Sequence, residues 1–289
     1  MMSNAVVTVP KDNKRKITVG EIFTHIFLLC CSVVWLYPIV WTILSSFKPQ
    51  KEFFKDRLSL IPDTFTLENY IRVWSKASFG TYFLNSVIVT VCSVALVLVM
   101  TNMTGYVLGR YRFMGRGVLM AVFLSSICIP LVSSLIPVYQ IVKTMGLMGT
   151  KLGLILSGAG GAHVVFLLLF SSYYSTIPRD MEDAAAIDGC GFLGTYLRVM
   201  MPLSSPINTT VIIMESVWTW NAFQLPLILT LNNPAARTLA VGLYAFKGEN
   251  TVDWTGICAG GAIAMVPIII IFIAFQKYFI NGMAGAVKS

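Results

Sequence analysis

Residues 178–202 read PRDMEDAAAIDGCGFLGTYLRVMMP and form the longest polar interruption in the apolar second half of the chain. Pro178 suits the first position of a helix, where its missing N–H costs no hydrogen bond. Three carboxylates fall in the first turns, where they offset the positive end of the helix dipole. A run of alanines then favours helix, and Gly189 fits the left-handed residue that closes one. We therefore expect a short helix that ends at Gly189.

A second helix is expected after this glycine. Its apolar residues fall at the i, i+1, i+4, i+5, i+8 spacing of a surface helix, namely Phe192, Leu193, Tyr196, Leu197 and Met200. Pro202 then begins the next apolar run. The stretch is predicted to be a helix–glycine–helix unit between two membrane spans, and the alternative is an amphipathic helix that lies on the membrane surface.

Composition places the chain among membrane proteins. Of its 289 residues, 56% are hydrophobic and 12% are charged, and the mean hydropathy is +0.76. Soluble domains carry about 25% charged residues, so this chain has too few charges to cover a large core against water. We predict an all-α polytopic membrane protein. The net charge of +8 suits phospholipid headgroups and an acidic partner, and no basic stripe with interleaved aromatic residues indicates nucleic acid.

Six apolar runs are long enough for the roughly 20 residues that a membrane helix needs. They are 22–46, 82–109, 117–142, 152–174, 203–229 and 257–280. The first run is too long for a signal peptide and no small-residue cleavage site follows it, so we expect it to remain as the first span. Six spans place both termini on one side of the membrane, but the distribution of Lys and Arg hardly decides which side.

The expected organisation follows from these runs. It comprises an N-terminal tail at 1–21, a first transmembrane helix at 22–46, an external linker at 47–78 with an amphipathic helix near 67–74, a transmembrane core at 79–281, and a C-terminal tail at 282–289. No internal repeat is visible, which argues against a complete secondary transporter with two related halves.

No motif indicates catalysis, a bound cofactor or a metal. Residues 189–194 match G-x-G-x-x-G, but no strand precedes them, so a dinucleotide site is not expected. No P-loop sequence occurs, and any ATP must be bound by a separate subunit. The six cysteines show no C-x-x-C spacing and are expected to pack as small hydrophobic residues. His25 and His163 stand apart from other ligand-type residues.

The fifth apolar run carries the most informative polar residues. Glu215 is the only acidic side chain inside any apolar run, and Trp218, Asn221 and Gln224 follow it at steps of three. An ionisable residue at membrane depth normally faces a cavity or a partner, and aromatic rings beside amides suit a sugar path. Steps of three wind around a helix, so we expect Trp218 and Asn221 to line the path and Glu215 to be satisfied by a partner subunit. Pro226 is expected to bend this span.

Two alternatives apply to this run: a structural polar cluster between subunits, and a membrane enzyme. The enzyme would need a second catalytic group at helical spacing from Glu215, and none is present. Elsewhere, the Gly105–Gly109 and Gly256–Gly260 pairs predict close helix packing. We favour the same interpretation for the small residues at 158–162, over a loosening of the fourth span.

The spacing within the polar loop resembles a known pattern. Permease subunits of binding-protein-dependent ABC importers carry E-A-A, three residues, G, nine residues and I-x-L-P. The matching positions here are Asp183, Ala184, Ala185, Gly189, Val199, Met201 and Pro202, with Asp, Val and Met in place of Glu, Ile and Leu. In that family the loop is a coupling helix that docks in a groove of the ATPase subunit, and the resemblance implies this role for 178–202.

Further stretches resemble the smaller membrane subunit of maltose-type oligosaccharide importers. They are W-x-W-N-x-F at 218–223, GRYRFMGR at 109–116, IPVYQIVKTMGLMGTKLGLIL at 136–156, RTLAVGLYAF at 237–246 and the C-terminal tail. Ala222 stands where the family usually has Glu, so any role of that Glu is absent. The resemblance covers residues 79–289.

The resemblance implies a permease subunit that translocates a sugar by alternating access and does no covalent chemistry. The implied partners are a second, homologous permease, two ATP-binding subunits that use ATP and Mg, an extracytoplasmic sugar-binding protein, and the lipid bilayer. The chain itself is expected to bind no cofactor. It is placed in the bacterial inner membrane, multi-pass, with both termini cytoplasmic. A permease of the same superfamily for a non-sugar solute is the alternative.

Overall fold

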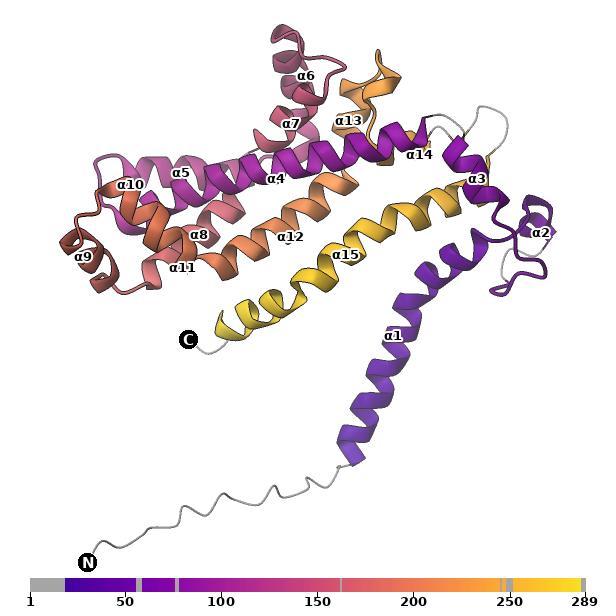
Figure 1. The fold of residues 1–289 in the computed structure, drawn as a ribbon, viewed down its shortest axis with the longest axis horizontal. Coiled ribbons are helices and arrows are strands. Elements are labelled where there is room, and N and C mark those ends of the chain that lie inside the picture. The colour runs from indigo at the N-terminus through magenta and orange to yellow at the C-terminus, as the bar shows by residue number, and fades with distance from the viewer. Residues whose placement is uncertain are drawn as a thin grey trace, which may run out of the picture.

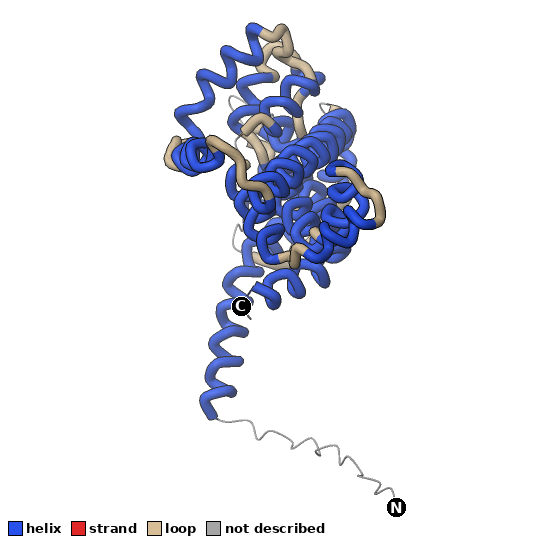
Figure 2. Tube along the Cα trace, turned by 90° about the vertical axis from the view of Figure 1, so that its left-hand side faces the viewer, coloured by secondary structure: helices blue, strands red, loops and turns tan. Residues whose placement is uncertain are grey.

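The computed structural model describes residues 19–55, 59–75, 78–161, 163–244, 246–247 and 252–286, and the elements in these ranges are helices (Figure 1; Figure 2). Most of the expected N-terminal tail and the last three residues of the C-terminal tail lie outside this part of the chain. Many large apolar side chains of the outer helices are exposed. Such a surface suits contact with lipid, as the composition predicts.

The central helix of the fold is α4 (Phe79–Arg110). It packs along α7 (Lys151–Ala159), α8 (Val164–Thr176) and α12 (Ser205–Asn221). The long C-terminal helix, α15 (Trp254–Ala286), packs on α12, which thus lies between α4 and α15 (Figure 1).

Glycines let α4 approach its neighbours closely, as the small-residue pairs predict. A Cβ atom on Gly105 would collide with the Cβ atom of Phe170, and one on Gly109 would lie 2.6 Å from a carbonyl oxygen of α8. A Cβ atom on Gly260 of α15 would collide with a terminal methyl of Leu243, a side chain that can move. Because no side chain fits at Gly105 or Gly109, α4 packs closely against α8 at these two positions.

The expected span at 117–142 is not one straight helix. It consists of α5 (Arg116–Ile127), a 3-10 turn η1 (Leu131–Ser134) and α6 (Leu135–Thr144), and the two arms are bent by 102°. Pro130 explains the break, because proline has no N–H to donate and disfavours helix at the residue before it. As a result α6 projects away from α4 (Figure 1).

The fourth expected span is also divided. α7 and α8 are bent by 52° across the segment that contains Gly160 and Gly161. The small residues therefore open the helix, and the expectation that they only tighten the packing is wrong. Ala162, within this break, lies outside the described residues.

The fifth expected span breaks earlier than predicted. α12 ends at Asn221, and α13 (Gln224–Leu229) begins after two residues, so the break precedes Pro226 by about one turn. The ring of a proline crowds the carbonyl four residues before it, which here belongs to Ala222. The helix therefore stops at that carbonyl and not at the proline.

Among the residues it describes, the structure supports between three and five membrane spans, whereas the sequence predicts six. In the described part of the chain, three helices are long and apolar enough to cross a membrane: α1 (Val19–Ser45), α4 and α15. Counting each bent pair as one span gives five. α12 has 17 residues and falls just short of a full span by itself.

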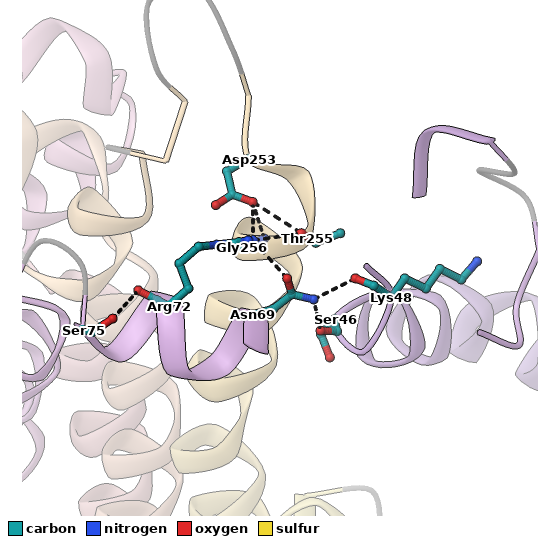
Figure 3. Close-up of polar contacts among 8 residues, drawn as sticks. All are labelled: Ser46, Lys48, Asn69, Arg72, Ser75, Asp253, Thr255 and Gly256. Atoms are coloured by element: carbon teal, nitrogen blue, oxygen red, sulfur yellow. Dashed lines mark hydrogen bonds and ion pairs between the residues drawn. The ribbon is translucent and has the colours of Figure 1, made fainter. Parts of the chain in front are cut away.

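A polar cluster joins α3 to α15 and to the residues just after α1 (Figure 3). It lies at the end of the molecule opposite α9 (Figure 1). Arg72 of α3 (Glu68–Ser75) pairs with Asp253 at 2.8 Å, and Asp253 accepts a hydrogen bond from the first turn of α15 at 2.9 Å. Asn69 donates to two backbone carbonyl oxygens just after α1, at 2.7 and 2.8 Å. From this cluster α1 and α15 diverge (Figure 1).

The linker before α4 contains more structure than the sequence predicted. The amphipathic helix expected near 67–74 is confirmed as α3, and an additional short helix, α2 (Gln50–Lys55), precedes it. Between α13 and α15 lie η3 (Pro234–Ala236) and α14 (Leu239–Tyr244). Asn85 of α4 holds this segment by donating to two of its carbonyl oxygens, at 2.8 and 3.0 Å.

Candidate coupling and substrate-path sites

The polar loop begins with the helix and the glycine that the sequence predicts. α9 (Asp180–Ile187) carries three carboxylates in its first turn. Gly189 follows with a φ of +81°, in the left-handed region that favours glycine. The N–H groups of Gly189 and Cys190 bond back to the carbonyl oxygens of Ala186 and Ala185 at 3.0 and 2.9 Å. This is the usual hydrogen-bond pattern of a helix closed by glycine.

The second helix of the loop is less regular than predicted. It divides into α10 (Phe192–Thr195), a π-helical turn η2 (Tyr196–Met200) and α11 (Met201–Leu203). The wide hydrogen bond of η2 spans five residues. Pro202 accounts for this turn, because it cannot donate a backbone bond and crowds the carbonyl four residues before it.

The residues that match the coupling pattern fall into two groups. The first group lies in and just after α9: Asp183, Ala184 and Gly189 are exposed and Ala185 is buried. The second group lies before α12: Val199 and Met201 are partly buried against the core, and Pro202 is exposed. Apolar side chains beside the first group are also exposed, and Ile187 is 88% exposed. The outer face of α9 and the start of α10 therefore form an exposed surface of acidic and apolar residues, which no other part of the described chain covers.

Glu182 fixes α9 to the end of α4. Its carboxylate accepts from Arg110 Nε at 2.8 Å and from the hydroxyl of Tyr106 at 2.9 Å. The side chain of Arg110 is only 5% exposed and also donates to the carbonyl oxygen of Ile177 at 2.7 Å. From the sequence, Glu182 was predicted only as one of the three carboxylates in the first turn of α9. The one signal for this clamp was an arginine at the end of a long apolar run.

Glu215 lies inside this chain, with 2% of its surface exposed. Its Oε1 accepts from the Thr219 hydroxyl at 2.8 Å, and its Oε2 lies 3.4 Å from His163 Nδ1. The other ring nitrogen of His163 lies 3.0 Å from the carbonyl oxygen of Gly158. Within the described residues Oε2 has no hydrogen-bond partner, so the expectation that a partner subunit satisfies Glu215 stays a prediction. His163, which is isolated in the sequence, is its neighbour at the break between α7 and α8.

Trp218 stands at the end of a stack of three rings. Its indole lies 5.1 Å from the ring of Phe166 at 23°, and Phe166 lies 5.7 Å from the ring of His163 at 5°. Phe166 covers one side of the indole, yet half of the Trp218 side chain remains exposed. Stacking of this kind stabilises the pair beyond the effect of the buried area, so contact with Phe166 fixes the orientation of the Trp218 ring.

Asn221 and Gln224 flank the break between α12 and α13 and are both exposed. Asn221 donates to the carbonyl oxygen of Val217 in its own helix at 2.8 Å. Trp218, Asn221 and Gln224 are thus open while Glu215 is covered, and this division agrees with the winding argument from the sequence. The described residues contain no group of three or more His, Cys, Asp or Glu side chains that could hold a metal ion.

Family comparison assigns the chain to a class. The family described as "binding-protein-dependent transport system inner membrane component" matches residues 101–285. This match covers more than half of the chain, and the chain belongs to this family of transport components.

Individual relatives agree over nearly the whole length. The probable ABC transporter permease protein YurM of Bacillus subtilis is 33% identical over 98% of this chain and 93% of its own length. The arabinooligosaccharides transport system permease protein AraQ of Halalkalibacterium halodurans is 34% identical over 88% of this chain and 91% of its own. The diacetylchitobiose uptake system permease protein NgcG of Streptomyces coelicolor is 32% identical over 88% of this chain and 84% of its own length.

A solved structure confirms the fold. One chain of a bacterial ABC transporter involved in the import of the acidic polysaccharide alginate matches with a TM-score of 0.81. The match covers 93% of this chain and 100% of that chain at 22% identity. The two chains share the same all-α fold.

Proposed function

We propose that this chain is one permease subunit of an ATP-binding-cassette importer that carries a sugar, most simply an oligosaccharide, across the bacterial inner membrane. The observation that supports it most is the set of relatives, because two that are named for oligosaccharide uptake align over 88% of this chain at 32–34% identity. The uncovered face of α9 adds support, since a permease driven by a separate ATPase needs such a surface.

Six spans complete this proposal. They are α1, α4, the bent pairs α5–α6 and α7–α8, α12 with α13, and α15. α9 lies at one end of α4, and α3 lies at the other (Figure 1). If α9 faces the cytoplasm, both termini are cytoplasmic, and the linker at 47–78 and the segment at 232–253 face outward.

The proposed assembly contains four kinds of partner. A second, homologous permease packs beside this chain in the bilayer, and two ATPase subunits, which bind ATP and Mg, dock from the cytoplasm. An extracytoplasmic sugar-binding protein delivers the substrate on the other side. We assign ATP binding to separate subunits because this chain has no P-loop sequence of its own.

Coupling begins on the exposed face of α9. Asp183, Ala184 and Gly189 contact the ATPase, and the Glu182–Arg110 clamp carries a displacement of α9 into α4. The segment that contains Val199, Met201 and Pro202 transmits the same displacement to α12. Closure of the ATPase dimer thereby opens the sugar path to the outside. When the ATPases separate, the path opens inward.

Trp218, Asn221 and Gln224 contribute to the sugar path from the α12–α13 break. The open face of the Trp218 indole can stack on the C–H surface of a sugar ring, and the two amides can bond its hydroxyls. Glu215 lies behind this surface, where Thr219 bonds its Oε1, and its second oxygen, beside His163, is left for the partner permease.

Co-purification with sugar-dependent ATPase activity tests the proposal. The tagged chain, extracted from membranes in detergent, should bring with it a second permease and a P-loop ATPase. ATP hydrolysis by this complex should rise when the sugar-loaded binding protein is added. A chain that purifies alone, or an ATPase that responds to a non-sugar solute and not to sugars, contradicts the assignment.

A further inference from the structure

A buried polar cluster, which we call the Asn102 cluster, lies at the α9 end of the molecule. Asn102 of α4 is 1% exposed. Its carboxamide oxygen accepts from the hydroxyls of Tyr174 at 2.7 Å and Tyr196 at 2.8 Å. Its nitrogen donates to Ser204 Oγ at 3.2 Å and to Asn208 Oδ1 at 2.6 Å. Both lone-pair positions and both N–H groups of the amide are therefore used.

The four partners of Asn102 belong to different parts of the chain. Tyr174 lies in the last turn of α8, and Tyr196 begins the π-helical turn η2. Ser204 lies between α11 and α12, and Asn208 is in the first turn of α12. One side chain of α4 thus contacts the segments that enter and leave the coupling loop.

Simple burial of a polar residue does not require such a cluster. The neighbouring Thr101 is also buried, and its hydroxyl bonds only to the carbonyl oxygen of Val97 in its own helix, at 2.7 Å. Asn102 instead satisfies its amide across four elements. A buried polar network that is fully satisfied specifies one arrangement of the elements that carry it, so the cluster fixes how the loop joins the helices.

The Tyr196 hydroxyl is a permanent donor in this cluster. Burial, with a smaller contribution from Tyr174, raises the pKa of Tyr196 to about 12, so the phenol keeps its proton at physiological pH. The ring of Tyr196 also lies 5.2 Å from that of Tyr106 on α4. A π-helical turn holds one residue more than an α-helical turn, and the bond from Tyr196 to Asn102 keeps η2 in this register.

We propose that Asn102 is the positioning residue that locks the coupling loop to α4, α8 and α12, so that a displacement of α9 moves these helices as one body. The inference rests on the proposed function, because it gives the cluster a part in coupling ATP hydrolysis to transport. Without the lock, α9 follows the ATPase while the spans lag behind. ATP is then hydrolysed without sugar movement.

The test compares three variants of the complete transporter in proteoliposomes. Asn102→Leu removes all four hydrogen bonds at similar volume, and Tyr196→Phe removes one hydroxyl. Thr101→Val is the matched control, because it removes a buried hydroxyl that bonds only within α4. For each variant we would measure the ATP hydrolysed per sugar transported, the amount of assembled complex, and its melting temperature.

Tyr196→Phe should raise the ATP hydrolysed per sugar by up to about ten-fold, the factor that corresponds to one lost hydrogen bond of ordinary strength. Asn102→Leu, which removes four, should raise it further, and Thr101→Val should leave it unchanged. A parental ratio in Tyr196→Phe, or hydrolysis and transport that fall in parallel with the amount of complex, overturns the inference. Tyr196→Phe decides the question if Asn102→Leu does not assemble. Failure of the parental complex to transport sugar would instead refute the proposed function.

Discussion

Replacement of Gly189 tests whether the closing turn of α9 is needed for coupling. Its φ is +81°, and no atom lies within 4 Å of a Cβ atom placed there. A new side chain thus meets no neighbour, and the cost comes from the backbone alone. For an L-residue in the left-handed region this cost is about 1–2 kcal/mol, and it is larger for a β-branched residue and smaller for Asn.

A cost of 1–2 kcal/mol changes the population of the loop conformation by roughly 5- to 30-fold. We therefore expect Gly189→Ala to reduce ATP-dependent sugar uptake by up to this factor and Gly189→Val to reduce it further. Gly189→Asn should stay close to the parental rate. All three variants should insert normally, because the position is exposed and outside the helix packing.

Uptake is measured in proteoliposomes that hold the complete transporter, with the amount of inserted chain determined by immunoblot. Gly189→Asn serves as the matched control, because it adds a side chain in a backbone conformation that Asn tolerates. Parental uptake by Gly189→Val would refute the reasoning. An equal loss in the Asn, Ala and Val variants would show that the side chain, and not the backbone, causes the defect.

Three further predictions concern topology, the α9 clamp and the sugar path. In a cysteine-free background, Lys51→Cys should react with an impermeant thiol reagent in intact cells, and Ala186→Cys should react only after permeabilisation; labelling of Ala186→Cys in intact cells contradicts the orientation. Glu182→Gln should lower uptake by roughly 10- to 100-fold, because hydrogen bonds to a charged group contribute about 1.5–3 kcal/mol, whereas the exposed Asp180→Asn should change little; equal effects in uptake assays would exclude a special role for the clamp. Trp218→Ala and Asn221→Ala should each cut sugar-stimulated transport by about ten-fold at unchanged assembly, and parental rates in both would make α12 purely structural.

The features that the sequence predicted are those with a local cause. The helix before Gly189, the left-handed glycine itself and α3 all follow from residues within a few positions of one another. The approach of α8 to α4 at Gly105 was also predictable, because a pair of glycines four residues apart lets membrane helices approach closely.

The features that the sequence did not predict depend on residues far apart in the chain. Arg110 and Glu182 are 72 positions apart, and nothing near either residue identifies the other. His163 and Glu215 meet only because α8 packs close to α12. Likewise, an apolar run has the same composition whether its helix is straight or bent, so the 102° bend after α5 was not visible in the sequence, although Pro130 marked its position.

The most direct test of the account is sugar uptake by the reconstituted complex of this chain with its partner permease, the two ATPase subunits and the binding protein. We expect labelled oligosaccharide to accumulate against its gradient only when ATP and Mg are on the α9 side and the loaded binding protein is on the side of α3. Accumulation without ATP, or without the binding protein, would contradict the assignment of this chain as an ATP-driven, binding-protein-dependent permease.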